Sequence, residues 1–109
     1  MGRKQIISLL ENGSTVLRYP LKFLYLQGQE PAGLVVSVPK RNFKRAVRRN
    51  LLKRRIREAV RHNIELLGEC PPDLMIIYVS KEIESYETIS SAVVSAFKKI
   101  AGVSAGKAD

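Results

Sequence analysis

The chain has very few of the residues that build disulfides and zinc sites. Its 109 residues include one cysteine, Cys70, and one histidine, His62. A lone cysteine excludes an intramolecular disulfide, and the two residues together argue against a Cys/His zinc site. This composition favours a reducing intracellular setting, so we expect a cytoplasmic protein that binds no metal of its own.

Tryptophan and long apolar runs are also missing. No apolar stretch approaches the roughly 20 residues that span a bilayer, and the N-terminal segment turns polar at Glu11-Asn12 before an export signal develops. We therefore expect no membrane association. The sequence also shows no Ser/His/Asp or paired-carboxylate arrangement, so we predict no catalytic residues in this chain.

The length and the hydrophobic content of 45% fit one compact domain. We place this domain at residues 1–102 and predict a disordered tail at 103–109. Residues 4–12 carry apolar side chains at helical spacing, and Gly13 supplies a stop. Strands are predicted at 21–26 and 33–38, joined by a turn at 28–31, and together they suggest a hairpin extended by a short strand at 14–17.

After Pro39 the apolar period changes to 3.6 residues. This spacing predicts a long helix over 43–67, with Asn42 as its N-cap and Gly68 as its stop. A continuous apolar run at 74–79 is typical of a central strand. Ser85 is the expected cap of a final helix, so the predicted order is αββ(β)αβα, in which the strand at 14–17 is optional.

Cations are concentrated in one part of the chain. Eleven of the nineteen lysines and arginines lie between residues 40 and 61, with a single acid among them. On a helix, this segment sorts into an apolar stripe made of Leu52, Ile56, Ala59, Val60, Asn63 and Leu67. The roughly opposite sector carries Asn50, Lys53, Arg54, Arg57 and Arg61.

A solvated helix face is the ordinary explanation of a charge run, but the spacing argues against it here. Lys53, Arg57 and Arg61 are successive i, i+4 neighbours of like charge, and each such pair costs about 0.2 to 0.5 kcal/mol. A face selected for stability would place glutamate between them. Because arginine suits phosphate and the opposite face is needed for the core, the pattern favours a nucleic acid over a membrane.

At these residues the chain resembles the protein component of bacterial ribonuclease P. The basic stretch of that family has the form K-[KR]-x(n)-A-V-x-R-N-x-x-K-R-x-x-R-E. Here Lys40-Arg41 is followed by Ala46-Val47-Arg48-Arg49-Asn50-Leu51-Leu52-Lys53-Arg54-Arg55-Ile56-Arg57-Glu58. The likeness extends over nearly the whole chain, including the N-terminal helix that ends at Gly13.

The resemblance implies an α+β fold, a single αβββαβα domain with a mixed sheet. Its long basic helix would lie in a left-handed β-α-β crossover, as in the second domain of ribosomal protein S5. It further implies a protein that binds a large catalytic RNA and the 5′ leader of precursor tRNA. In that family the RNA carries out the Mg²⁺-dependent removal of the leader, and no obligate protein partner is expected.

Carried over residue by residue, the motif positions and their basic neighbours form the predicted RNA surface. Its members are Lys40, Arg41, Lys44, Arg45, Arg48, Arg49, Asn50, Lys53, Arg54, Arg55, Arg57 and Arg61. The chain departs from the family at Leu51, where an arginine is common. We expect Arg48 and Arg55, its neighbours at i−3 and i+4, to restore the charge there.

The second departure concerns the groove that holds the single-stranded leader, which family members often line with aromatic residues. The matching positions here are Ile6 and Leu10 from the first helix and Lys22 and Leu24 from the strand, with Phe23 and Tyr25 as alternatives. Core packing explains Ile6 and Leu10 equally well. We expect a weaker leader grip, or one shifted onto Tyr25, because stacking contributes about 1 to 3 kcal/mol per base.

Two other functions stay open at this point. A stand-alone RNA-binding or DNA-binding module could use the same helix for shape recognition. A metal-dependent nuclease would need a carboxylate cluster, and the acidic residues Glu82, Glu84 and Glu87 are better explained as a solvated helix start. The spaced motif favours the ribonuclease P resemblance over both.

Overall fold

The computed structural model describes the backbone of residues 3–26, 33–68 and 72–104. The predicted turn at 28–31 and Cys70 lie outside the described residues. The order of elements is the predicted αβββαβα, with one short 3-10 helix, η1, added after the basic helix. The elements are α1 (Arg3–Asn12), β1 (Ser14–Arg18), β2 (Leu21–Leu26), β3 (Leu34–Ser37), α2 (Ala46–Asn63), η1 (Ile64–Leu67), β4 (Asp73–Tyr78) and α3 (Tyr86–Ser104).

The four strands form one mixed sheet in the order β1-β2-β4-β3. β1 pairs with β2 and β2 with β4 in antiparallel fashion, whereas β3 runs parallel to β4. The predicted hairpin between residues 21–26 and 33–38 is therefore wrong, and the hairpin is instead formed by β1 and β2. β4 separates β2 from β3 because its side chains are apolar on both faces, which suits the centre of a sheet.

The parallel pair β3 and β4 is joined through α2. This confirms the β-α-β crossover around the basic helix that the family resemblance implied. The left hand of that crossover and the likeness to ribosomal protein S5 are not decided by strand order, and they stay predictions.

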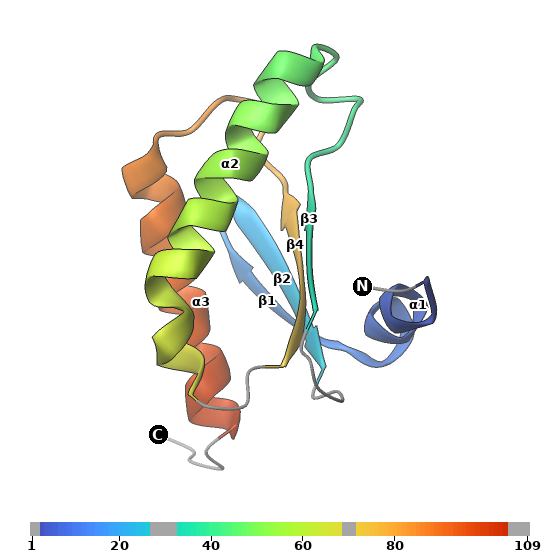
Figure 1. Cartoon of the computed structure of the whole chain (residues 1–109), viewed down its shortest axis with the longest axis vertical. Coiled ribbons are helices and arrows are strands. Elements are labelled where there is room, and N and C mark those ends of the chain that lie inside the picture. Colours follow the sequence, from blue (N-terminus) through green and yellow to red (C-terminus); the bar gives the residue numbers. More distant parts are fainter. Residues whose placement is uncertain (1–2, 27–32, 69–71, 105–109) are drawn as a thin grey trace.

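The sheet is covered unequally on its two sides. Figure 1 shows α2 and α3 packed along one side and α1 on the other. Phe23 of β2 meets Phe97 of α3 edge to face, with ring centroids 6.2 Å apart. The core of the α2/α3 side contains Val16, Leu21, Phe23, Val36, Val38, Phe43, Leu52, Ile56, Ala59, Val60, Leu67, Leu74, Ile76, Tyr78, Ile89, Ala92, Val93, Ala96, Phe97 and Ile100.

The α1 side has a much smaller apolar contact. Leu9 of α1 is fully buried and Leu24 of β2 is almost so. α1 ends where the chain must pass close to its own backbone, since a Cβ at Gly13 would lie 2.5 Å from the Leu9 carbonyl oxygen. The Gly13 amide donates to that same oxygen at 2.9 Å, and the predicted stop is thus confirmed.

α2 begins three residues later than predicted. Asn42 does not cap it; the Asn42 amide instead donates to the Pro39 carbonyl in a turn. Phe43 is buried against Tyr78, with ring centroids 5.7 Å apart. Burying Phe43 requires an extended approach, and Arg45, with φ −82° and ψ 126°, stands at the N-cap position.

α3 begins as predicted, because the Ser85 hydroxyl accepts a hydrogen bond from the Thr88 amide at 3.2 Å. The helix continues through Ser104, so the first two residues of the predicted tail are helical. Residues 105–109 lie outside the described ranges.

None of the helices within residues 3–26, 33–68 and 72–104 is both long enough and apolar enough to cross a membrane.

Candidate nucleic-acid interface

The inward face of α2 anchors the helix to the sheet and to α3. Leu52, Ile56 and Ala59 are fully buried, and Val60 nearly so. Asn63 is half-buried, and its Nδ2 donates to the Ala59 carbonyl at 2.7 Å. The predicted apolar stripe is confirmed, so the opposite sector must face solvent.

The predicted RNA surface is indeed largely exposed. Nine of its members are exposed, and three, Arg49, Lys53 and Arg55, are half-buried. Among the side chains that the structure describes, Arg61 is the one member of the set paired with a carboxylate, at 2.7 Å from Glu58. The positive charge of α2 is therefore compensated very little within the described protein, as expected for a surface that neutralises a polyanion.

Arg49 has a structural contact that the sequence did not indicate. Its Nη1 donates to the carbonyls of Phe43 at 2.7 Å and Lys44 at 2.9 Å. These bonds hold the extended segment against the first turn of α2. Because a guanidinium has five N–H donors, Arg49 can brace this turn and still present donors to a phosphate.

Arg55 holds α2 against the segment that leads into α3. Its Nη1 donates to the Glu84 carbonyl at 2.6 Å. The Tyr78 hydroxyl accepts from the Glu84 amide at 2.9 Å and donates to the Glu82 carbonyl, so residues 82–84 are fixed between β4 and α2. Burial raises the pKa of Tyr78 above its usual value. Arg55 is thus directed toward α3, and the expected compensation at Leu51 would depend mainly on the exposed Arg48.

The cationic residues of α2 occupy two flanks. At about 100° per residue, Lys53 and Arg57 lie roughly 200° around the helix from Arg55. Since Arg55 points to the α3 side, Lys53 and Arg57 lie on the flank that faces away from α3. A bound polyanion can therefore contact α2 over a wide arc.

An apolar patch interrupts the cations on the outward face. Val47 is 78% exposed, and with Asn50, Leu51 and Arg54 it lines a shallow hollow of about 450 Å³. The sequence reasoning treated Leu51 as a missing charge and did not notice Val47. The signal was present, because Val47 and Leu51 are i, i+4 neighbours on a face that is otherwise polar.

Most of the predicted leader groove lies on the α1 side of the sheet. Lys22 and Leu24 point to that side, and Ile6 and Leu10 lie on α1, where Leu10 is 56% exposed. Tyr25 does not join them. Successive residues of a strand face opposite ways, and Tyr25 packs against the α2/α3 core with Phe23. The proposed shift of the leader grip onto Tyr25 is corrected accordingly.

The floor of this surface contains residues that the sequence reasoning missed. Val35, Met75 and Ile77 stand beside Leu24 and Lys22 in the register of the sheet and are all half-exposed. Their alternation with buried neighbours could have identified them, but only once β4 was known to lie next to β2. The α1 side thus offers an apolar, half-open floor beside one lysine.

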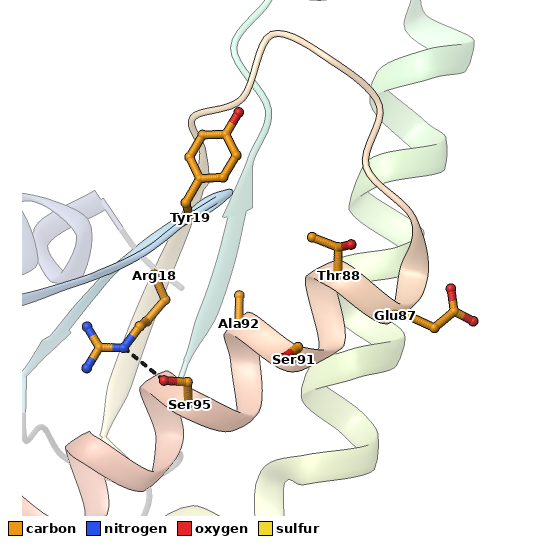
Figure 2. A pocket seen from close by; sticks show the side chains of 7 residues that line it. All are labelled: Arg18, Tyr19, Glu87, Thr88, Ser91, Ala92 and Ser95. Carbon is orange, nitrogen blue, oxygen red and sulfur yellow. Dashed lines mark hydrogen bonds between the residues drawn. The ribbon is translucent and has the colours of Figure 1, made fainter.

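A separate hollow of about 480 Å³ lies between the end of β1 and α3 (Figure 2). Arg18 Nε donates to Ser95 Oγ at 2.9 Å, and the exposed Tyr19 donates through its hydroxyl to Ser80 Oγ at 3.0 Å. Glu87 also lines this hollow, whereas none of the twelve residues of the predicted RNA surface lines it. We leave this hollow out of the interface.

The acidic residues that the structure describes are not grouped as metal ligands. Within the described ranges, no group of three His, Cys, Asp or Glu side chains is placed to hold a metal ion. In the small cluster near α3, one oxygen of Glu84 instead accepts from the Ser80 hydroxyl at 3.1 Å. The interface is therefore built from cations and apolar groups.

Comparison with known proteins identifies the family. The family model described as Ribonuclease P matches residues 2–101. The chain is 34% identical to the ribonuclease P protein component of Porphyromonas gingivalis, over 92% of its own length and 80% of that protein's.

Solved structures share the fold. The RNase P protein of Thermotoga maritima has a TM-score of 0.77 at 22% identity, over 90% of this chain and 93% of that one. The Staphylococcus aureus RNase P protein has a TM-score of 0.74 at 21% identity, over 94% of each chain. From the family match, the curated relative and the common fold, we conclude that the chain belongs to the ribonuclease P protein family.

Proposed function

We propose that the chain is the protein subunit of ribonuclease P, which binds the catalytic RNA and the 5′ leader of precursor tRNA. In this role it assists removal of the leader during tRNA maturation, while the RNA carries the catalysis. The observation that carries the proposal is the outward face of α2. Its cations are exposed and little compensated, on a helix whose other face is committed to the core.

The catalytic RNA would bind along α2 and the turn before it. Lys40 and Arg41 are exposed in that turn, close in sequence to the braced first turn of α2. Arginine forks can hold phosphate oxygens in pairs, and Asn50 can bond a base edge or a ribose hydroxyl. The bonds from Arg49 to the carbonyls of Phe43 and Lys44 keep this segment in one conformation before RNA arrives.

The leader would lie on the α1 side of the sheet. Ile6, Leu10, Lys22 and Leu24 are kept from the sequence prediction, with Met75 and Ile77 added as floor. None of the side chains that the described strands point to this side is aromatic. We therefore propose that the leader is held by apolar contact and by Lys22 at a phosphate, with little base stacking.

Magnesium in this proposal belongs to the RNA. The chain's own contribution in this proposal is electrostatic and positional, made by the exposed cations of α2. By neutralising phosphates that would otherwise repel each other, α2 lets the two RNAs approach closely. Mg²⁺ held by the RNA would supply the chemistry of leader removal.

Reconstitution tests the proposal. The purified chain is combined with its organism's ribonuclease P RNA and a leader-bearing precursor tRNA, and 5′ cleavage is followed at low magnesium. We expect the protein to stimulate cleavage, and the protein alone to cleave nothing. RNA binding without any stimulation would instead support a stand-alone RNA-binding module. A matched substrate without a leader separates the two surfaces, because leader contacts should affect only the leader-bearing RNA.

A further inference from the structure

A cavity of about 480 Å³ lies in the groove between α2 and α3, beside the proposed RNA surface. It is lined by Arg54, Arg55, Glu58 and His62 from α2 and by Tyr86 from α3. The last three of these residues were not in the predicted RNA surface. Arg54 also lines the hollow next to Val47, so the cavity and the outward face of α2 share this side chain.

The polar groups of the cavity are held in place by the protein. Arg55 Nη1 is bonded to the Glu84 carbonyl at 2.6 Å. Glu58 Oε1 accepts a hydrogen bond from Arg61 Nη2 at 2.7 Å, and Glu58 Oε2 lies 3.7 Å from His62 Nε2. The Glu58 side chain is nonetheless 45% exposed, so a ligand can reach its carboxylate. Groups positioned in advance lose little entropy when a ligand binds.

The fifth residue supplies an aromatic wall. Tyr86 is half-buried, and part of its ring packs against the core of the α2/α3 side. A ring held in this way can stack on a flat ligand without losing further freedom. These three kinds of group in one small cavity match the three parts of a nucleotide. Cations suit its phosphate, a carboxylate can accept hydrogen bonds from the edge of its base, and an aromatic ring can stack on the face of the base.

The combination selects among the bases. A carboxylate accepts two parallel hydrogen bonds, and only guanine offers two adjacent N–H donors on its Watson–Crick edge. Adenine, cytosine and uracil each present a single N–H group in the corresponding place. Glu58 therefore favours guanine over the other three bases.

We infer that this cavity binds an unpaired guanine of the RNA that lies along α2, with Tyr86 against its face, Glu58 on its Watson–Crick edge and Arg54 at its phosphate. The inference rests on α2 being the RNA surface proposed above. It adds selection of one particular base to a helix whose cations are proposed to contact phosphate, and it places that selection on the α3 flank.

Binding of short RNAs to the full chain tests this directly. The probes are fluorescent oligouridines that carry one central guanosine, adenosine or inosine, and the readout is fluorescence anisotropy. We expect the guanosine oligomer to bind about tenfold more tightly than the adenosine oligomer, the discrimination typical of a bidentate base contact. Inosine lacks the 2-amino group and should fall between them. Equal affinity for guanosine and adenosine would overturn the inference.

Matched variants separate recognition from charge. Glu58→Gln and Glu65→Gln each remove one acid, from α2 and from η1, so both should slightly strengthen binding to the adenosine oligomer. Glu65→Gln should do the same for the guanosine oligomer, whereas Glu58→Gln should weaken it by loss of the base contact. Only Glu58→Gln should abolish the preference for guanosine, and a preserved preference would contradict the role of Glu58. Tyr86→Phe should bind like the original protein, whereas Tyr86→Leu should weaken binding roughly fivefold or more because the stacking wall is removed.

The outcome is independent of the cleavage test. Stimulated leader removal with no guanosine preference would leave the proposed function standing and reject the base site. A clear guanosine preference that Glu58→Gln removes, without stimulated cleavage, would support the base site and reject the tRNA-processing role.

Discussion

The inward and outward faces of α2 carry side chains with opposite effects on stability. Ile56 and its inward neighbours are fully buried in a core shared with the sheet and α3. The outward face places cations at i, i+4 spacing, where they repel one another, and exposes Val47 among them. The inward face stabilises the fold, whereas repulsion between like charges on the outward face destabilises the helix slightly. The difference shows which half of the helix is available for a partner.

The largest expected effect is on the inward face. Ile56→Ala should lower the free energy of unfolding by about 2 to 5 kcal/mol, because it leaves a cavity in a packed core. Val47→Ala is the matched control on the outward face and should change the free energy of unfolding by about 0.5 kcal/mol or less. Urea denaturation measures both. Similar decreases from the two variants would contradict the contrast between the faces.

Arg55 lies between the two faces and should show a mixed effect. Arg55→Ala removes the bond to the Glu84 carbonyl, and we expect a decrease of roughly 1 to 2 kcal/mol in unfolding free energy. Arg48→Ala, an exposed neighbour, should leave stability unchanged. Thermal unfolding of the two variants decides whether Arg55 braces α3; equal stabilities would show that it does not.

On the outward face the expected change is in salt dependence. Lys53→Ala and Arg57→Ala should each reduce the slope of log affinity against log salt by about 0.9 or less for each phosphate that the side chain neutralises in the complex. The free energy of unfolding of each variant should stay the same or rise by a few tenths of a kcal/mol, which is about the repulsion energy of one like-charge pair. Lys98→Ala on α3 is the control. An unchanged slope would mean that neither side chain meets phosphate.

The smallest expected effect is on the free energy of unfolding at alkaline pH, and it comes from Tyr78, which is buried in the core. Because burial raises the pKa of Tyr78 in the folded protein, the unfolded chain loses this proton first as pH rises. The stabilisation is fully present below the unfolded pKa of about 10 and is lost as pH rises through the folded pKa. Unfolding free energy should therefore fall more steeply above that pH than in Tyr78→Phe. Parallel curves for the two proteins would contradict this.

Local patterns in the sequence predicted most elements. The apolar spacing of α2 and α3, the stop at Gly13 and the cap at Ser85 depend on residues within a few positions of one another. The structure confirms each of these. The two faces of α2 were predictable for the same reason, because a helix converts spacing into direction.

The errors came from contacts between distant residues. Nothing in residues 21–38 indicates that β4 will separate β2 from β3, so a hairpin was the natural prediction. Asn42 is an adequate cap by itself, but burial of Phe43 against Tyr78 keeps the preceding segment extended. The side occupied by Tyr25 follows from the register of β2, which the sequence did not specify.

By itself the sequence determined the order of elements, the division of α2 into a core face and a cationic face, and the family motif from Lys40 to Glu58. The tertiary structure alone decided the strand order, the bracing roles of Arg49 and Arg55 and the side of the sheet on which Tyr25 lies. It also decided the cavity between α2 and α3. Periodicity encodes which side chains share a face, whereas packing decides which faces meet. Tyr86 and Glu58 line one cavity only because of that packing.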